Sequence, residues 1–566
     1  MKRRSRFLSL ILIVGCLIGA WLFWVYPRPV DMAAYAPADS LLYLEANHPM
    51  EIFDAVSNTD AWRAIGNLTG TPTSESHGRW FRSFVRWTGL GPIRTVILTR
   101  AQVAVVVSEL RAAEEGDSLN VKPEGALLIE THTSERRIRP IVEETLKTLA
   151  ERTYGRPTER RRVIDGVEFV EWVAPDSSRQ LVSAIFGSLV IVGTSEHVVQ
   201  QCLAVAQRRA ASLTGDAELQ AMRARLPSER ALTFGYVPRA NSARLLAVSL
   251  PILLGRAPGD SQFQRLITNG ATKIFGSVGW SSGTYLSGIE DRYLINLAPS
   301  IVEKLKPTFV STGADSQTGL PNVYSITKYD FANPLATWQT LKTAVSSQVD
   351  ALSTVLFSSL LKSALLSYGI DEPEAFLAAA DRDLQTIRLD GISDRSILVA
   401  RVRDRSSLRQ LFLKTMRPAN NGAQTAKTEM FEDAEHEVGA GLTDDLVVAG
   451  NPVDVRRYFE VAAELNKHSA HGNKMAFFAS RPTNASVVTY SNDSDRLRRF
   501  AATLIEARAA SVSSETLEAV LARQPYSVTE TRLGERGIER TNRSPLGQFS
   551  SIVPLLFPEK SDASRR

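Results

Sequence analysis

The sequence predicts an α+β protein in which an N-terminal transmembrane helix precedes two tandem homologous domains of antiparallel sheet with packed helices. Three observations lead to this prediction. An uncharged apolar run fills residues 7–26, segments of the second half match segments of the first half in the same order, and turn signals separate short β-rich runs. Hairpins imply antiparallel pairing, and the helices between them favour a helical layer on such a sheet.

The first 26 residues have the pattern of a membrane anchor. Residues 1–6 carry four basic side chains, and the run from Phe7 to Tyr26 has the length of about 20 apolar residues that a spanning helix needs. Because a positive flank stays in the cytoplasm, we expect a single-pass protein of the cytoplasmic membrane with its bulk in the periplasm or outside. Two alternatives stay open, a cleaved signal peptide and lipidation of Cys16, which ends a loose lipobox pattern.

The composition is that of an ordinary globular protein. Hydrophobic residues make up 44% of the 566 and charged residues 22%, which excludes a disordered chain. The net charge of +5 is small and the basic residues are scattered, so no nucleic-acid binding is expected. The densest basic patch, at residues 156–162, is expected to be a solvated loop. Cys16 lies in the apolar run, so it is not expected to pair with Cys202, which should pack as a small apolar residue.

The second half of the chain repeats the first. The segment that begins at Tyr236 matches the one at Tyr490, residues 126–142 match 396–412, and LVIVG at 189–193 matches LVVAG at 446–450. Several matches in order, with an offset that drifts smoothly, predict duplication of a whole domain. The resulting plan has a cytoplasmic flank at 1–6, the anchor at 7–26, a linker at 27–36, repeat domain 1 at 37–305, repeat domain 2 at 315–556 and a polar tail at 557–566.

Elements of the first copy follow from turn chemistry and periodicity. An Asp-Gly pair between two β-rich runs is a strong hairpin signal, because these residues accept positive φ. Apolar residues at helical spacing mark the helices. We expect, in chain order, a strand at 40–45, a helix at 80–87, two short strands within 95–107, a strand at 126–130, a helix at 138–149, hairpins turning at Asp165-Gly166 and near Gly187-Ser188, helices at 198–208 and 218–226, a strand at 231–236 and a hairpin turning at Ser282-Gly283.

The second copy restarts near residue 322 and keeps the same order. We expect strands at 322–326, 384–389, 396–402 and 446–449, helices at 355–366 and 455–465, and a last hairpin that turns at Gly534-Glu535.

One known family shares this organisation. PADSLLYLEAN at 37–47 comes just after the anchor, and an LVIVG-type strand, a helix, a segment with Ser212-Leu213 and Leu219, and a strand ending at Tyr236 follow. In these features the chain resembles the bacterial domain-of-unknown-function family 3352, over nearly all of its length past residue 37. The resemblance implies this architecture and an exported, membrane-anchored setting, and it implies no catalytic residues.

A G-x-S-x-G string is the first candidate for chemistry. Gly279–Gly283 places Ser281 where a nucleophile elbow has its serine. That elbow needs a helix directly after the serine, and here an alternating strand follows. The matched segment of the second copy, residues 529–533, has no serine. We therefore expect a hairpin at this string.

Histidine and aspartate pairs are the other candidates. His468 and His471 lack the third and fourth ligands that zinc requires, so a surface loop is expected there. Asp444-Asp445 is expected at a turn tip, and Asp493 with Asp495 at the start of a helix, where capping explains them.

Two apolar helices could form an interaction surface. One has a leucine stripe at Leu352, Leu356, Leu360, Leu361 and Leu365, and the other carries Trp80, Phe81, Phe84 and Trp87. Packing against a sheet is the expected role. The alternative is a groove or membrane-facing surface that holds an acyl chain, a peptide or a partner helix.

No catalytic, cofactor-binding or metal-binding residue is therefore predicted, and no cofactor is expected. The sequence favours a non-catalytic binding or scaffold role at the membrane, with an envelope protein or an apolar ligand as the partner. An envelope hydrolase with an unrecognised active site is the alternative, and it would need a convergent set of polar side chains.

Overall fold

The computed structural model describes residues 29–68, 101–115, 118–226, 231–253, 261–309, 311, 323–391, 395–419, 428–433, 435, 437–467, 485–508 and 511–551. The predicted anchor at 7–26, the predicted helix at 80–87, both candidate histidines and the tail at 557–566 lie outside these residues. No helix in the described ranges has the length and apolar character that a membrane span needs.

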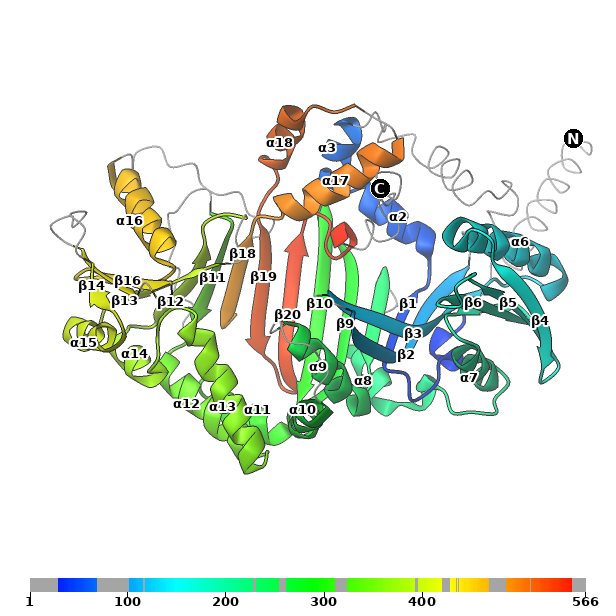
Figure 1. Ribbon diagram of the computed structural model, residues 1–566, viewed down its shortest axis with the longest axis horizontal. Helices are drawn as coiled ribbons and strands as arrows, with labels where there is room; N and C mark the ends of the chain where they lie inside the picture. Colours follow the sequence, from blue (N-terminus) through cyan, green and yellow to red (C-terminus); the bar gives the residue numbers. More distant parts are fainter. Residues whose placement is uncertain are drawn as a thin grey trace, which may run out of the picture.

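The fold is α+β, as predicted, and its main feature is one long antiparallel sheet (Figure 1). Within the described residues the sheet has twenty strands. From one edge to the other they are β4 (Thr158–Ile164), β5 (Val167–Val173), β6 (Gln180–Phe186), β7 (Leu189–Gly193), β3 (Ser118–Glu130), β2 (Gln102–Glu115), β1 (Leu42–Ala46), β8 (Thr233–Val237), β9 (Phe275–Tyr285), β10 (Gly288–Leu297), β20 (Gly537–Ser544), β19 (Ser527–Leu533), β18 (Val487–Ser491), β11 (Ser325–Asp330), β12 (Asp383–Arg388), β13 (Ile397–Arg401), β17 (Leu446–Gly450), β16 (Val438–Leu442), β15 (Glu429–Asp433) and β14 (Arg417–Pro418).

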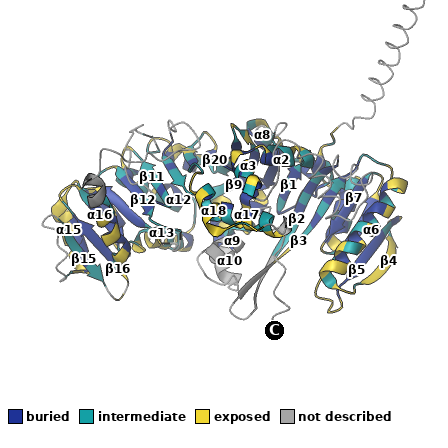
Figure 2. Cartoon of the chain, turned by 90° about the horizontal axis from the view of Figure 1, so that it is seen from above, coloured by how far each residue is buried: buried dark blue, intermediate teal, exposed yellow. Residues whose placement is uncertain are grey.

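Helices connect and cover these strands. They are η1 (Met32–Tyr35), α2 (Pro49–Ser57), α3 (Asp60–Leu68), α6 (Glu135–Tyr154), α7 (Glu196–Ala206), η2 (Leu213–Gly215), α8 (Ala217–Arg225), α9 (Arg239–Leu253), α10 (Ser261–Ile274), α11 (Pro299–Leu305), α12 (Pro334–Ser346), α13 (Ala351–Leu366), α14 (Pro373–Ala379), α15 (Arg405–Thr415), α16 (Pro452–Lys467), α17 (Ser494–Arg508) and α18 (Ser514–Leu521). Figure 2 shows buried residues along the strands from one end of the sheet to the other.

The strand order is the same when read outward from the centre in either direction. It runs β10, β9, β8, β1, β2, β3, β7, β6, β5, β4 on one side and β20, β19, β18, β11, β12, β13, β17, β16, β15, β14 on the other. Each strand of the first half therefore has a counterpart in the second half at the same place. The matched segments LVIVG and LVVAG are β7 and β17, and Tyr236 and Tyr490 lie in the corresponding strands β8 and β18.

The ladders correct one of the sequence matches by a single residue. Gly193 pairs with Ala126, whereas the register of β13 and β17 places Gly450 opposite Ile397. Ala126 thus corresponds to Ile397 and not to Ser396. The predicted match was wrong for the strand because it holds only for the helices that come after the strands. The N-caps of these helices, Ser134 and Asp404, are separated by the offset that the sequence match predicts. The loop before the helix is one residue longer in the first copy, and a one-residue slip would exchange the faces of a strand.

The two halves meet where β10 pairs with β20. Tyr236 pairs with Gly279 and Tyr490 pairs with Val528, so the halves correspond here at an offset of 249 residues (528 − 279). At this offset Arg292 corresponds to Thr541, and these two residues are direct partners across the seam. A pseudo-twofold axis therefore passes between them, perpendicular to the sheet, because only that direction relates adjacent antiparallel strands without exchanging the faces.

Helices of each half pack on the other half. α17 and α18 contact α2 and α3 beyond one end of the central strands, and α10 contacts α13 beyond the opposite end (Figure 1). In the second contact Gly270 of α10 lies against Ser353, and a Cβ at Gly270 would be 3.6 Å from the serine side chain. The shared core of the first contact contains Val56, Ala61, Ile65, Leu232, Ile289, Leu497, Phe500, Ala501, Leu521, Leu546 and Phe549. Each half also has its own core on the sheet.

Most predicted turns are confirmed. Asp165 and Gly166 have φ of 53° and 77° between β4 and β5, and Gly187 has φ of 65° between β6 and β7. The last hairpin turns at 534–536, as expected. The turn predicted at Ser282-Gly283 is wrong, because both residues lie inside β9 and the chain turns at Leu286-Ser287.

Two further expectations are corrected by the strands. The second strand expected within 95–107 extends to Glu115, and residues 95–100 lie outside the described ranges. The basic patch expected to be a loop contains β4, an edge strand. Arg161 and Arg162 lie there beside glutamates: Arg161 Nη2 is 3.0 Å from Glu143 Oε2, and Arg162 Nη2 is 3.2 Å from Glu171 Oε2.

Candidate functional site

A groove of about 410 Å³ lies on one face of the sheet at the seam between the halves. The first half contributes α8 and β10, and the second half contributes β19, β20 and Ala485, two residues before β18. The lining residues are Arg225, Leu226, Arg292, Tyr293, Leu294, Ala485, Glu530, Arg532, Glu539, Arg540, Thr541 and Arg543. On the groove face itself, the side chains of four arginines (Arg225, Arg292, Arg532 and Arg543) and two glutamates give the lining a formal excess of two positive charges.

Strand geometry places these side chains together. Side chains alternate between the faces of a strand, so Glu290, Arg292 and Leu294 share one face of β10. Their direct partners on β20 are Arg543, Thr541 and Glu539, in that order. The charged residues at alternate positions of two neighbouring strands therefore form one charged surface.

Glutamates hold the guanidinium groups in place. Arg543 Nε donates to Glu290 Oε2 at 2.7 Å and its Nη1 donates to Glu530 Oε2 at 2.8 Å. Arg292 Nε donates to the other oxygen of Glu290 at 2.6 Å. Burial acts to lower the pKa of Arg543, but the hydrogen bond to Glu290 and the nearby carboxylates outweigh it and raise that pKa. Arg543 therefore stays charged, and its guanidinium stacks on the ring of Tyr285, 5.0 Å from the centroid.

A second set of contacts joins α8 to β20. Arg225 donates to Asn296 Oδ1 at 3.0 Å and to Glu539 Oε1 at 3.2 Å. Arg532 Nε donates to the second oxygen of Glu539 at 2.9 Å. Arg540 is exposed, and among the described residues it makes no ion pair. On β20, however, Arg540 alternates with Glu539 and Thr541, so its side chain lies on the opposite face of the sheet. Arg292 lies on the groove face and donates to Glu290 through Nε, so its Nη groups are available to a ligand.

The groove continues into a neighbouring hollow. This hollow, of about 440 Å³, shares Arg225 and Glu539 with the groove and adds Ala221, Ala224, Glu535 and Arg536. The charged surface thus extends from the centre of the sheet toward the hairpin tip of the second half, which suits an elongated ligand better than a single small ion.

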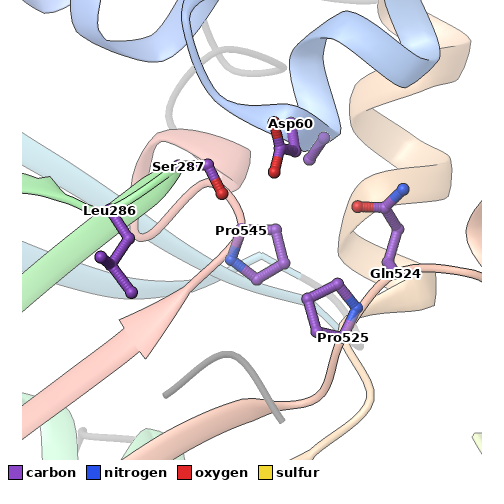
Figure 3. A pocket seen from close by; sticks show the side chains of 7 residues that line it. Asp60, Leu286, Ser287, Gln524, Pro525 and Pro545 are labelled. Carbon is purple, nitrogen blue, oxygen red and sulfur yellow. The ribbon is translucent and has the colours of Figure 1, made fainter. Parts of the chain in front are cut away.

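A third hollow lies at the edge of the sheet near α3 (Figure 3). It encloses about 230 Å³ and is lined by Asp60, Ala61, Leu286, Ser287, Gln524, Pro525 and Pro545. Asp60 is the one carboxylate of this lining, and it forms an ion pair with Arg63 at 3.2 Å. The lining offers no second carboxyl, histidine or thiol, so it holds no pair of groups for acid–base chemistry.

The opposite face of the seam carries a buried polar network. Asp291, 1% exposed, accepts hydrogen bonds from Ser282 Oγ at 2.5 Å, from the backbone N–H of Gln548 at 3.1 Å and from Asn542 Nδ2 at 3.3 Å. Burial raises the pKa of the Asp291 carboxyl, although these hydrogen bonds act in the other direction. The network joins both halves across the seam.

Ser281 lies in the middle of β9 and is 3% exposed. Its direct strand partners are Arg292 and Phe234. The strand continues to Tyr285 and the next element is β10, so the strand–turn–helix geometry of a nucleophile elbow is not formed here. The hairpin expected for this string is present, with its turn four residues later than expected.

The candidate aspartates have structural positions. Asp444 and Asp445 lie at the tip between β16 and β17, as expected, and Asp444 is 3.5 Å from Arg405. Asp495 lies in the first turn of α17 and pairs with Arg498. The side chain of Asp493 does not cap the helix as expected, because it accepts a hydrogen bond from Ser527 on β19. Burial raises the pKa of Asp493.

The leucine stripe of α13 is only partly a core feature. Leu365 packs against the core of the second half, whereas Leu352 is 57% exposed. Ser353 is the buried residue of this helix, because the face toward α10 must fit against Gly270. Core packing was therefore the wrong expectation for Leu352. The aromatic counterpart, Trp80 to Trp87, lies outside the described residues.

Cys202 packs as a small apolar residue, as predicted. It is fully buried in the core of the first half, and burial raises the pKa of its thiol to about 12. Across the ranges that the structure describes, no group of three or more histidine, cysteine and carboxylate side chains is placed to hold a metal ion.

Sequence reasoning missed the groove because its residues are distant in the chain. Arg225, Arg292 and Arg543 belong to three separate segments, and only the pairing of β10 with β20 brings them together. The one local signal was the charged alternation in each strand, GIEDRYLINL and GIERTNRS.

Comparisons of the chain with protein-family models, with curated proteins and with solved structures find no match. The resemblance to family 3352 therefore stays a prediction made from the sequence.

Proposed function

We propose that the chain is an exported, membrane-anchored binding protein whose seam groove holds an anionic ligand. The observation that carries this proposal is the lining of the groove, in which arginine side chains from both halves exceed glutamates by four to two on the groove face. Guanidinium groups are planar donors with five N–H bonds, and they recognise carboxylates and phosphates in bidentate geometry. Their contacts with glutamates leave further N–H donors for a ligand, and the positive excess attracts anions over a distance.

Several features support the setting of this protein. The apolar run at 7–26 with its basic flank supports a single-pass anchor in the cytoplasmic membrane and a body outside it. The shared strand order supports two homologous repeats, at about 37–305 and 315–556, that arose by duplication. The sequence favoured an envelope protein or an apolar ligand as the partner, and the charge of the groove favours an anionic partner over an apolar one.

A binding role fits the groove better than the alternative of an envelope hydrolase. Covalent hydrolysis needs a nucleophile with an adjacent base. The lining of the groove contains neither serine, cysteine nor histidine, and its two glutamates hold arginines in place.

The test is titration of the purified full-length chain with two polyanions, inorganic polyphosphate and poly-L-glutamate, in a calorimeter. Arg292→Gln is the diagnostic variant, since the Arg292 side chain lies on the groove face of β10. Arg540→Gln, which removes the same charge from the opposite face of the sheet, is the matched control. Binding to Arg292→Gln should be about tenfold weaker or more, as loss of a charged hydrogen bond of about 1.5–3 kcal/mol implies.

The two polyanions distinguish phosphate from carboxylate recognition. Absence of binding to both, or an equal loss in Arg292→Gln and Arg540→Gln, would refute the proposal.

A further inference from the structure

The chain is fixed to the sheet directly after the predicted anchor. The backbone N–H of Val30 donates to Gln102 Oε1 at 2.7 Å, and Gln102 Nε2 donates to the carbonyl of Val30 at 2.9 Å. Gln102 is the first residue of β2 and is 1% exposed. Its side chain thus binds both polar groups of one backbone residue, as a neighbouring strand would.

Two further polar side chains hold Gln102 itself. Its Nε2 also donates to Asn47 Oδ1 at 3.0 Å, and His132 Nε2 lies 3.1 Å from its Oε1. The backbone N–H of His132 donates to Glu130 at 2.9 Å, and Glu130 also accepts a hydrogen bond from Tyr35 at 3.1 Å. The position of Val30 is therefore fixed relative to the strand ends formed by the start of β2 and the end of β3, which we call this edge of the sheet.

The tether between the predicted anchor and this fixed point is short. The apolar run ends at Tyr26, four residues before Val30, and four residues span at most about 14 Å. The headgroup layer on each side of the hydrocarbon core is itself about 5–8 Å thick. A rigid body held this close must place the edge that carries Val30 against the membrane surface.

The side chains at this edge suit a bilayer surface. β2 begins here, β3 ends here at Glu130, and β7 begins here at its partner Leu189. The tip between β6 and β7 lies beside the loop that bears His132, because the backbone N–H of Thr131 donates to the carbonyl of Ser188 at 3.0 Å. Next to that tip Phe186 is 39% exposed.

The first turn of α6, just after the same loop, adds positive charge to this edge. Arg136 and Arg137 are both exposed there. Phenylalanine is among the apolar side chains that insert at the membrane interface, and each arginine near an anionic surface contributes about 1 kcal/mol of attraction.

We infer that this edge, with Phe186, Arg136 and Arg137, rests on anionic phospholipid headgroups of the outer leaflet. The inference rests on the anchor of the proposed function. The inferred contact defines the orientation of the body as well as its location. In the first half, the strand ends at this edge face the bilayer.

The test uses the full-length chain with Cys16→Ser, reconstituted in nanodiscs of mixed phosphatidylglycerol and phosphatidylcholine. Cys202 is buried, so one added cysteine carries the fluorophore. Phe186→Cys and Arg137→Cys report on the edge, and Ser178→Cys is the control. Ser178 is exposed beyond the other end of β6, roughly 26 Å away from Phe186 at about 3.3 Å per residue. The readout is quenching by a nitroxide on the lipid headgroup.

Quenching should be several-fold stronger at positions 186 and 137 than at 178, and Arg136→Glu should weaken it when phosphatidylglycerol is present. Equal quenching at both ends of β6, or stronger quenching at 178, would overturn the orientation while leaving the anchor intact. A chain that does not enter nanodiscs at all would refute the anchor, and the orientation with it.

Discussion

Replacing Phe500 by alanine should weaken both halves of the molecule. Phe500 is fully buried on α17 of the second half, and its ring centroid lies 5.4 Å from that of Trp62 on α3 of the first half. Its neighbours in the shared core include Ile65 from the first half and Leu521 from the second. Truncation of a fully buried phenylalanine costs about 3–5 kcal/mol. This loss is shared because the cluster contains residues from both halves.

Hydrogen exchange of backbone amides measures where the loss falls. If opening of the shared core limits exchange in α2 and α3, a loss of about 3–5 kcal/mol speeds exchange there by roughly a hundredfold to several thousandfold. Residues 60–68 of the first half should therefore respond to a change at residue 500 as strongly as α17 and α18 do.

Phe412→Ala is the matched control for this prediction. Phe412 is also fully buried, but its core belongs to the second half alone, where its ring centroid lies 5.7 Å from that of Phe431. Exchange in α14 and α15 should rise in this variant and exchange in α3 should not. Unchanged exchange in α3 of the Phe500→Ala chain would show that the halves are energetically independent. An equal rise in α3 in both variants would show that the whole molecule opens as one unit, so that the shared core has no special part in the coupling.

Three further outcomes are expected. A Cβ on Gly235 would lie 2.1 Å from the ring of Trp280, so Gly235→Ala should cost about 1–3 kcal/mol or more in thermal unfolding. Nothing lies within 4 Å of a Cβ at Gly283, and Gly283→Ala should stay within about 0.5 kcal/mol; similar losses for both would contradict the packing. The raised pKa of about 12 for Cys202 predicts that a thiol reagent such as Ellman's leaves the folded Cys16→Ser chain unmodified and labels one thiol after denaturation, whereas rapid labelling of the folded chain would contradict its burial. Burial raises the pKa of Asp291, so the folded state binds its proton more tightly than the unfolded chain, and ionisation costs stability as the pH rises through that pKa. The unfolding free energy of the native chain minus that of Asp291→Asn should therefore increase as the pH falls from about 7 toward about 4; a decrease would contradict this assignment.

The predictions that succeeded rest on local physics. Asp165-Gly166 forms its turn because both residues accept positive φ, and the turn needs no help from the rest of the fold. The turn tip at Asp444-Asp445 is similar, since the hydroxyl oxygen of Thr443 accepts hydrogen bonds from the backbone N–H groups of Asp445 and Leu446. Hydrogen bonds within three residues can be predicted from three residues of sequence.

The turn expected at Ser282-Gly283 failed because a distant residue competes with local turn chemistry. Ser282 donates its hydroxyl to Asp291 across the ladder, and Gly283 pairs with Glu290 within it. Leu286 takes the turn instead with φ of 50°, a conformation that a leucine rarely adopts. The length of the β9–β10 ladder, and not the turn residues, decides where this hairpin ends.

The seam and its groove could not be predicted from the sequence, because they depend on which strands become neighbours. Arg543 and Glu290 are 253 residues apart and meet only through the pairing of β10 with β20. The order of the matched segments predicts two similar halves. It does not predict whether their sheets join, or at which strand.

The seam also shows how the two halves have diverged under the proposed duplication. In an identical pair of first halves, Arg292 would face a second Arg292 on the axis, and like charges directly opposite each other destabilise a ladder. The second half has Thr541 at that place, which removes the repulsion. Glu290 corresponds to Glu539, but Leu294 corresponds to Arg543, so Glu290 faces an arginine across the seam while Glu539 faces a leucine. The carboxylate of Glu539 therefore accepts hydrogen bonds from Arg225 and Arg532 instead, and it holds both side chains at the rim of the groove. A symmetric frame with unlike residues at equivalent places therefore accounts for one charged groove shared by both halves.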